Sequence, residues 1–487
     1  MSNLSDLLPS GGGQNIVEFT ASGTVASGKP VVLNANGTVS QIAATSVSQA
    51  VGSAVNFESG STVYTACVYD TTNDKVVIFY RDSGDSNKGK VVVGTVSGVS
   101  ITFGSIVEFE TDQVTYIDAA FDSVRNEIVV VYANDSQSSR GYARIGTVSG
   151  TSISFSSATV FESDTITHLT INYDVAADRF MVAYRNASNS NYGECKRGTN
   201  SGSSFGTSTA VVFQSNSVAN KIDSAYSTTD SKSVIAYSKS GEPNAITATI
   251  SGDSISVGSK QEIQGSAGDQ ATIAYDASAN RFVFLFRDEG NSDRPTIRTF
   301  ELSGTSITSL SSEVTLSSSS GEDYALVYDS NANKVTAFFR QSASGTKAVV
   351  ITDTSSGGAA AGSEFSASAT INTNASAVFD PDTKTIVHAY QNTSSSNRGD
   401  AFVYTNAYTD TNLTATNFIG LADAAISDTA TGKINVKGSI NSKQSSLTIG
   451  SDYYAQSDGT VATTSTSPAV KIGQAVTATT INMMDFT

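Results

Sequence analysis

The sequence predicts an all-β protein, a seven-bladed β-propeller inserted into a small β-domain formed by the N- and C-terminal segments. Three observations support this prediction. A pair of aromatic residues recurs seven times, the last repeat lacks a strand that is found before the first, and the two end segments resemble each other.

The composition of the 487-residue chain is typical of many short strands joined by polar turns. Charged residues make up 15% of it, Trp is absent, and Val, Ile, Tyr and Phe occur in short runs between segments rich in Ser, Thr, Gly and Asn. The net charge of −16 repels phosphate, so we expect no nucleic-acid partner and no anionic membrane surface. No stretch reaches transmembrane length, so we expect no membrane insertion.

The repeats are defined by two aromatic positions about 50 residues apart from one unit to the next. The first aromatic, usually followed by Asp, is Tyr69, Phe121, Tyr173, Tyr226, Tyr275, Tyr328 and Phe379. The second follows ten or eleven residues later and is Tyr80, Tyr132, Tyr184, Tyr237, Phe286, Phe339 and Tyr390. Seven units appear at both positions, which predicts seven blades.

Each unit reads as four strands. In the second unit these are 115–122, 127–134, 141–150 and 151–162, where alternating apolar residues give each strand a buried side. The links between them contain Asp or Gly, as tight turns require.

The last unit supplies only three strands, at 374–380, 385–390 and 400–406. Its fourth strand is found upstream, because VGSAVNFES at 51–59 resembles the fourth-strand endings FGSIVEFET and FSSATVFES. We therefore expect the first strand and the last three to share one blade, which closes a ring and removes the exposed edge. An open solenoid needs no such division.

The segments outside the ring also match each other. GKPVVLNANGTV at 28–39 and GSDYYAQSDGTV at 450–461 both place Asn-Gly or Asp-Gly between strand-like runs, a strong hairpin signal. The predicted organisation is an N-terminal arm at 1–15, a small β-domain from 16–47 plus 411–487, and the propeller at 48–410. Because strand direction alternates, we expect this domain on the face that carries the first-to-second turns, with the opposite face free.

The tail, which begins NFIGLADAA at 417 and continues through LTIGSDYYAQSDGTV and PAVKIGQA, resembles a β-rich module of tailed-bacteriophage virion proteins. The start of the chain, LSDLLPSGGGQN followed by FTASGTVASGKPVVLNANGTV, is similar to the start of such proteins. The resemblance covers roughly 120 residues, all outside the propeller. It implies a head-decoration, tail or fibre protein that binds other virion proteins or copies of itself, often as a trimer.

Candidate binding residues lie at the loop ends of the repeats. Arg81, Arg185, Arg287 and Arg340 each follow the second aromatic and could bind carboxylates or sulfates of a surface glycan. Alternatively, they could pair with acidic residues of neighbouring loops, such as Asp82, Glu110, Asp112, Asp164 or Asp288. Matching positions near the channel mouth hold Tyr64, Tyr116 and His168, where propellers usually bind ligands.

No catalytic arrangement is visible in the sequence. His168 and His388 lack a serine-and-acid partner set, and the aspartate boxes of a sialidase-like enzyme are missing. Cys67 and Cys195 have no metal or disulfide spacing, and the polar loops 81–90 and 287–293 lack the regular acidic spacing of a calcium loop. We therefore expect no cofactor, no metal and no enzymatic activity.

These observations favour a non-enzymatic virion structural protein that docks through the terminal β-domain and displays the propeller, with host-surface adhesion as a further role. The alternative is a glycan-binding or glycan-hydrolysing propeller, and a plain architectural spacer is a third reading. The first 15 residues have no basic region or long apolar run and so do not read as a secretory signal. We expect the protein to be made in the host cytoplasm, released by lysis and located in the virion.

Overall fold

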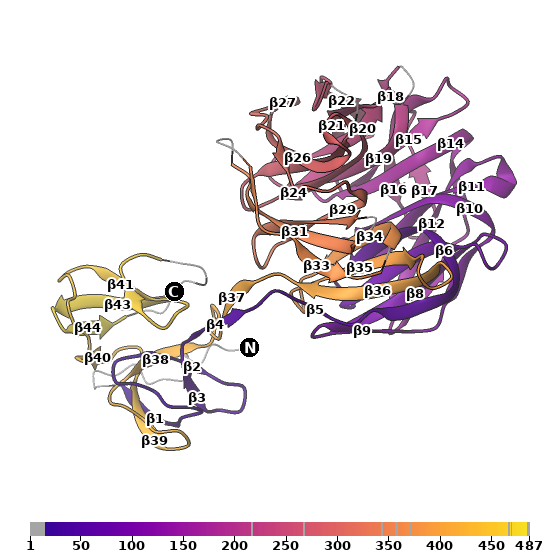
Figure 1. The fold of residues 1–487 in the computed structure, drawn as a ribbon. Coiled ribbons are helices and arrows are strands. Elements are labelled where there is room, and N and C mark those ends of the chain that lie inside the picture. Colours follow the sequence, from indigo (N-terminus) through magenta and orange to yellow (C-terminus); the bar gives the residue numbers. More distant parts are fainter. Residues whose placement is uncertain are drawn as a thin grey trace. The chain divides into compact units, whose positions relative to one another are not determined.

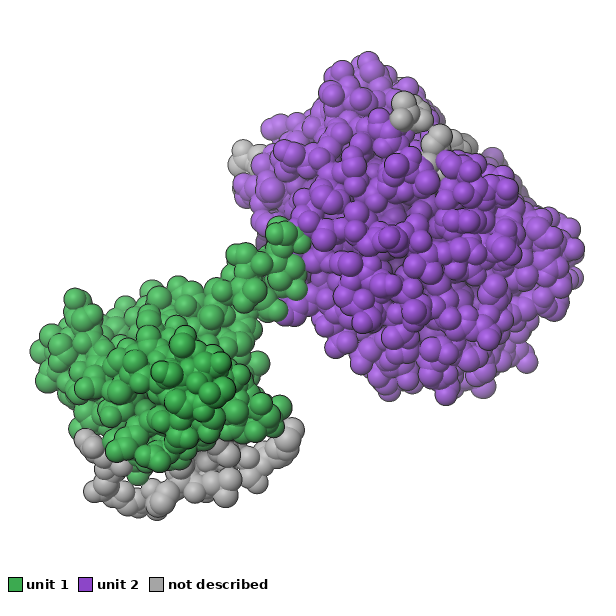
Figure 2. Space-filling model, turned by 60° about the horizontal axis from the view of Figure 1, so that its bottom comes forward, with its two compact units in different colours: residues 1–48, 407–487 green, residues 49–406 purple. Residues whose placement is uncertain are grey.

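The computed structural model describes residues 15–215, 218–265, 268–341, 344–355, 359–370, 372–465, 468 and 470–484. The predicted N-terminal arm, apart from Asn15, lies outside these residues. The chain divides into two compact units, one of residues 1–48 and 407–487 and the other of residues 49–406 (Figures 1 and 2). Within the described ranges, no helix has the length and apolarity needed to cross a bilayer.

The unit of residues 49–406 is built from antiparallel strands, and each sequence repeat contributes a hairpin of long strands followed by shorter outer ones. The first three repeats contain β5 (Ala50–Val51), β6 (Val55–Asp70), β7 (Lys75–Asp82), β8 (Lys88–Ser97), β9 (Ser100–Phe103), β10 (Val107–Asp122), β11 (Glu127–Asn134), β12 (Arg140–Ser149), β13 (Ser152–Phe155), β14 (Thr159–Asp174), β15 (Arg179–Asn186), β16 (Tyr192–Asn200), β17 (Phe205–Thr207) and β18 (Val211–Gln214). The fourth and fifth contain β19 (Val218–Ser227), β20 (Lys232–Lys239), β21 (Glu242–Ser251), β22 (Ser254–Val257), β23 (Gln261–Glu262), β24 (Gly268–Asp276), β25 (Arg281–Asp288), β26 (Arg294–Ser303), β27 (Ser306–Thr308) and β28 (Val314–Thr315). The last two contain β29 (Glu322–Asp329), β30 (Lys334–Gln341), β31 (Gly345–Asp353), β32 (Ala360–Ala361), β33 (Phe365–Ser368), β34 (Asn372–Asp380), β35 (Thr385–Asn392) and β36 (Arg398–Thr405). Short 3₁₀ turns, η2 (Asp135–Gln137) and η3 (Glu289–Asn291), follow β11 and β25.

Several strands belong to two repeats at once. The first part of β10 pairs with β8 of the first repeat, and its second part pairs with β11 of the next. β14 and β6 are shared in the same way. The start of β6 pairs with β36, with Ser61 opposite Arg398 and Val55 opposite Ala401. The segment upstream of the first repeat therefore completes the sheet of the last repeat, as the sequence predicts.

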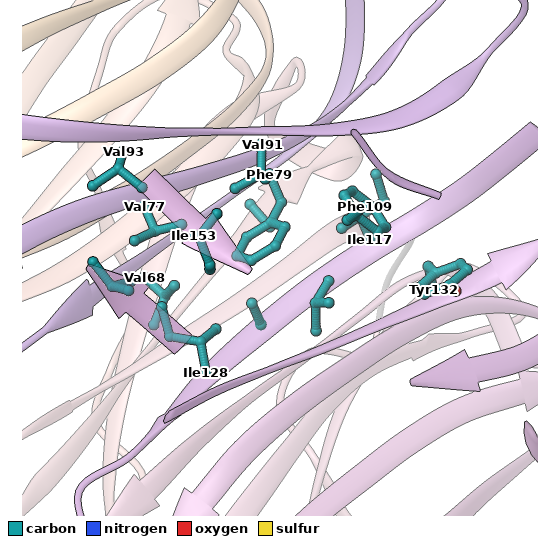
Figure 3. Packing of buried hydrophobic residues seen from close by; sticks show 14 of the residues in the cluster. Val68, Val77, Phe79, Val91, Val93, Phe109, Ile117, Ile128, Tyr132 and Ile153 are labelled. Carbon is teal, nitrogen blue, oxygen red and sulfur yellow. The ribbon is translucent and has the colours of Figure 1, made fainter. Parts of the chain in front are cut away.

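The first strands of all the repeats line one polar channel, which contains residues from Thr65 to Ala377. Sheets arranged around such a channel make a β-propeller. Neighbouring sheets enclose apolar clusters, and in the cluster of Figure 3 the ring of Phe109 lies 5.6 Å from that of Phe79 and 5.3 Å from that of Tyr132. A similar cluster joins Tyr80 of the first repeat to Phe57, Val387 and Val403 of the sheet that the last repeat shares with β6.

The Asp after the first aromatic fixes the turn to the second strand. The carboxylate of Asp122, for example, accepts hydrogen bonds from the backbone N–H groups of Val124 and Arg125, at 3.0 Å each. In the fourth repeat a hydroxyl takes this role, because Ser227 accepts from the N–H of Asp230. The side chain of Asn200 also donates to Asp122 from the third repeat, so the turn residue links neighbouring sheets.

The unit formed by the two chain ends contains two five-stranded sheets rather than one layer. The first has the order β1 (Ile16–Thr20), β39 (Thr431–Asn435), β38 (Phe418–Ala422), β2 (Pro30–Leu33), β3 (Val39–Gln41). The second has the order β40 (Ile440–Asn441), β44 (Thr480–Met483), β43 (Val470–Thr477), β41 (Asp452–Ala455), β42 (Val461–Ala462). A shared core that includes Val32, Phe418, Tyr453 and Ile472 holds the sheets together.

The two matching end segments form hairpins with the same hydrogen bonds. The N–H of Asn34 donates to the carbonyl of Thr38, and that of Gln456 donates to the carbonyl of Thr460. Gly37 and Gly459 have positive φ angles of 82° and 76°, which explains the Asn-Gly and Asp-Gly pairs. Each hairpin lies in a different sheet.

A two-stranded ribbon lies at the boundary between the units. It pairs β4 (Ala44–Val47) with β37 (Tyr408–Thr411) and clusters with the terminal unit. The propeller unit therefore covers 49–406 rather than the predicted 48–410. Inside the propeller, Ala50 pairs with Thr405, so the chain enters and leaves the ring at one point.

Candidate functional site

The candidate site lies at the mouth of the channel, where the first strand of every repeat is interrupted by a bulge. In the first repeat the pairing of β6 with β7 shifts between Val63 and Ala66, and the residue inside the shift, Tyr64, has a φ of 54°. The corresponding positions in all repeats have φ between 45° and 62°. These residues are Tyr64, Tyr116, His168, Lys221, Gln270, Asp323 and Asn374.

All of these bulge residues line one cavity of about 440 Å³ at the mouth. Each precedes the first aromatic of its repeat by five residues. The structure thus brings Tyr64, Tyr116 and His168 together, as the sequence suggests, and adds four polar residues. The constant spacing was visible in the sequence, but those four residues share no chemical character that would have marked them.

The rings of Tyr64, Tyr116 and His168 form one side of the mouth, which we call the aromatic sector. The ring centroids of Tyr64 and Tyr116 are 5.1 Å apart, and those of Tyr116 and His168 are 4.6 Å apart. The guanidinium carbon of Arg81 lies 4.8 Å from the centroid of Tyr64, a cation–π contact. Burial and the positive charge of Arg185 lower the pKa of His168 to about 4, so its ring is neutral at pH 7.

The other side of the mouth, the polar sector, consists of Lys221, Gln270, Asp323 and Asn374. The Lys221 ammonium donates to the carbonyl of Tyr324 at 3.0 Å, and burial lowers its pKa. The N–H of Asp323 donates to the side-chain oxygen of Gln270 at 2.8 Å. The Asn374 amide donates to Gln391 at 3.0 Å. Hydrogen bonds within the protein therefore hold all four side chains in place.

The four candidate arginines have different partners in the structure. Arg287 makes ion pairs with Asp269 at 2.8 Å and with Glu289 at 3.0 Å, and Arg340 pairs with Asp323 at 2.9 Å and with Glu322. Both therefore have acidic structural partners, and Arg340 contacts the polar sector through Asp323. Arg81 instead lies against the aromatic sector, and Arg185 acts on the charge state of His168.

Arg287 and Arg340 pair with acidic residues, but with ones other than the five that the sequence suggested. Asp82 pairs with Lys90 at 2.7 Å, Glu110 pairs with Arg144 at 3.4 Å, and Asp288 caps the 3₁₀ turn η3. Asp112 and Asp164 accept from the side chains of Asn134 and Asn186. Arg287 takes one partner, Glu289, from the adjacent loop, whereas Asp269 and Asp323 belong to the bulged first strands.

Deeper in the channel, a second cavity of about 330 Å³ is lined by carboxylates and hydroxyls. Asp118 accepts from the N–H groups of Ala119 and Ile171, and burial raises its pKa to about 7, with Asp223 as a further cause. Asp223 accepts from the N–H groups of Ser224 and Ile273. Because Ile171 and Ile273 belong to the following repeats, both carboxylates link neighbouring first strands.

The remaining sequence candidates take structural positions. Cys67 and Cys195 are free thiols whose pKa values are raised to about 12 by burial. At the end of β7 and in the loop after it, Asp82 and Asp85 form ion pairs with Lys90 of β8, at 2.7 Å and 2.9 Å. Among the described residues, no group of three or more His, Cys, Asp or Glu side chains could hold a metal ion.

No protein-family model matches the chain, and no curated protein matches its sequence. Solved structures do match. A Dos1 propeller is 9% identical with a TM-score of 0.48, over 73% of this chain and 95% of that one. The NanB sialidase of Streptococcus pneumoniae is 10% identical with a TM-score of 0.40, over 72% and 68% of the two chains. Sqt1 of Chaetomium thermophilum is 12% identical with a TM-score of 0.44, over 70% and 83%. At these identities the likeness concerns the fold alone.

Proposed function

We propose that the protein is a non-enzymatic structural protein of a tailed-bacteriophage particle. The terminal unit docks it on the particle, and the propeller is displayed toward the host surface. The observation that carries this proposal is the resemblance of the tail to phage virion modules, together with the place of those residues in the fold. The residues that carry the resemblance lie within residues 1–48 and 407–487, and their described part forms two sheets with a core of its own.

The proposal includes a propeller of seven blades inserted into the terminal unit. Seven repeats and the pairing of β6 with β36 support the blade count. The pairing of Ile16 with Asn435 supports the insertion, because residues from the two chain ends share one sheet.

The terminal unit also has a surface suited to assembly. Large apolar side chains that are 44–68% exposed occur on and beside its second sheet, and these are Ile440, Ile449, Val476 and Met484. Burial of such side chains favours contact with other virion proteins or with further copies, for which we propose a trimer. The proposed location is the virion, after synthesis in the host cytoplasm and release by lysis.

A non-enzymatic role agrees with the state of the two histidines. His388 is 1% exposed inside the core, and His168 belongs to a row of rings.

A second candidate function, glycan binding, is favoured by the aromatic sector, which presents ring faces and an arginine to a cavity at the channel mouth.

Immunogold electron microscopy of purified particles from the source, with antibody against the propeller, tests the proposal. Label on the head supports decoration, and label on the tail or fibres supports a host-contact role. Unlabelled particles, when an antibody to a known virion protein labels them well, would overturn the virion proposal.

Docking through the terminal unit can be tested separately by deleting residues 49–406. Because Val47 lies opposite Tyr408, an Asn-Gly turn can join Ser48 to Ala407 and convert the ribbon into a hairpin. We expect this variant to incorporate into particles. Failure of a demonstrably folded variant to incorporate would contradict docking through this unit.

A further inference from the structure

The bulge positions have a backbone shape that does not suit most of the side chains they carry. A backbone φ near +50° raises the conformational free energy of Tyr, Lys or Gln more than that of Gly or Asn, because the Cβ atom of the residue comes close to its own backbone carbonyl. Yet Tyr64, Tyr116, Lys221 and Gln270 occupy such positions inside strands. The bulge belongs to every repeat, and in each repeat the side chain at this position lines the mouth.

The two sectors of the mouth differ in what they can offer a ligand. In the polar sector, hydrogen bonds within the protein engage Gln270, Asp323 and Asn374. In the aromatic sector, Tyr64, Tyr116 and His168 line the cavity with rings that are partly exposed. Ile117, Leu169 and other apolar side chains complete the wall, so a ligand meets a broad apolar face. The cavity of about 440 Å³ falls within the usual size of small-molecule sites, roughly 300–1,000 Å³.

Charge at the mouth limits the class of ligand. Arg81 stands over Tyr64, and its Nε is buried without a hydrogen-bond partner among the described residues. Lys221 adds a second positive charge at the cavity. A cationic ligand on these rings would be repelled by both groups. A polyanion would be repelled by the net charge of −16, whereas a single carboxylate gains from a nearby guanidinium.

We propose that the mouth binds one carboxylated sugar residue, with the C–H face of its ring against Tyr64 and Tyr116 and its carboxylate on Arg81. The hydroxyl groups on the opposite edge of the sugar face the polar sector, where the Lys221 ammonium has further protons to donate beside the one bonded to the Tyr324 carbonyl. This inference rests on the proposed contact with a host surface and names the chemical group recognised there.

Ligand-observed saturation-transfer NMR on the full-length protein tests the inference, with glucuronate, galacturonate and N-acetylneuraminate as probes and glucose, galactose and acetate as comparisons. We expect at least one carboxylated sugar to bind with a Kd of about 1 mM or tighter. Arg81→Gln should weaken that sugar at least tenfold. Tyr116→Ala should remove its ring-proton signals, whereas Tyr116→Phe should retain them.

Arg125→Gln provides a charge-matched control, because Arg125 lies in the turn between β10 and β11, at the other end of the strand from Tyr116, and pairs with Asp178. This control should bind as the wild type does. The inference is overturned if no carboxylated sugar binds, if acetate competes as well as the sugar, or if Arg81→Gln leaves affinity unchanged in a protein with a native circular dichroism spectrum. Because the assay uses purified protein, its failure is distinguishable from unlabelled particles, which would overturn the virion proposal instead.

Discussion

Replacing His388 should stabilise the propeller and flatten its response to acid. His388 is 1% exposed, its ring stacks on Phe402 with centroids 4.8 Å apart, and neither ring nitrogen has a hydrogen-bond partner among the described residues. Burial lowers its pKa from 6.5 to about 3. The folded protein therefore holds a neutral imidazole whose two buried nitrogens have lost their hydrogen bonds to water and gained none from the described residues.

The sign of the pH effect follows from that lowered pKa. Between pH 6.5 and pH 3, the unfolded chain binds a proton at His388 that the folded protein does not bind, so stability falls as the pH falls through this window. The loss is about 1.4 kcal/mol per pH unit, or about 3 kcal/mol at pH 4.5 relative to neutral pH. At neutral pH, removing the unsatisfied nitrogens should add about 1–3 kcal/mol more stability.

The variant to measure is His388→Leu, because the corresponding positions in the other repeats hold Ile, Val, Phe or Ala. Urea unfolding, followed by tyrosine fluorescence in this Trp-free chain, gives the stability at pH 7.5, 6.0 and 4.5. The advantage of the variant over the wild type should grow by about 3 kcal/mol across this range. Phe284→Leu, at the same position of the fifth repeat, is the matched control, and its effect should not change with pH. Parallel stability curves for His388→Leu and the wild type would refute the reasoning.

Two further substitutions test the packing between repeats. Tyr132→Phe removes the hydroxyl that donates to Glu110 at 2.6 Å in the core. The free energy of unfolding in urea should fall by about 1–3 kcal/mol. A change near zero would show that the carboxylate finds another donor. Gly399→Ala would place a Cβ 2.4 Å from the ring of Phe57, where β36 meets β6. This clash should lower the free energy of unfolding by about 1–3 kcal/mol and speed amide hydrogen exchange in those strands. Gly206→Ala, which has open space around its Cβ, is the control, and equal effects of the two substitutions would contradict the clash.

Much of the fold could be predicted because its signals are periodic. The second aromatic is buried in each repeat, from Tyr80 to Tyr390, and the resemblance of 51–59 to later fourth strands predicts the pairing of β6 with β36. Asn-Gly and Asp-Gly mark the two terminal hairpins, since Gly37 and Gly459 both require positive φ. The division of the terminal unit into two sheets was not visible, because which strands pair depends on contacts between segments that lie 400 residues apart, such as Ile16 and Asn435.

The site was only partly predictable, for a physical reason. Aromatic residues in three neighbouring repeats revealed Tyr64, Tyr116 and His168. The bulge itself leaves no residue signature, because it is imposed by the pairing of two strands and holds Tyr, His, Lys, Gln, Asp or Asn in different repeats. Asp269 and Asp323, which pair with Arg287 and Arg340, therefore come from the bulged strands, whereas Glu289, the second partner of Arg287, comes from the adjacent loop.

The strands that pair across the whole chain affect the order in which the protein can be completed during synthesis. Ser61 leaves the ribosome long before its partner Arg398, and Ile16 long before Asn435. Both units therefore keep an unpaired strand until residues 398 and 435 have been made, which exposes an edge to other nascent chains. A chain that stops before residue 398 can complete neither unit.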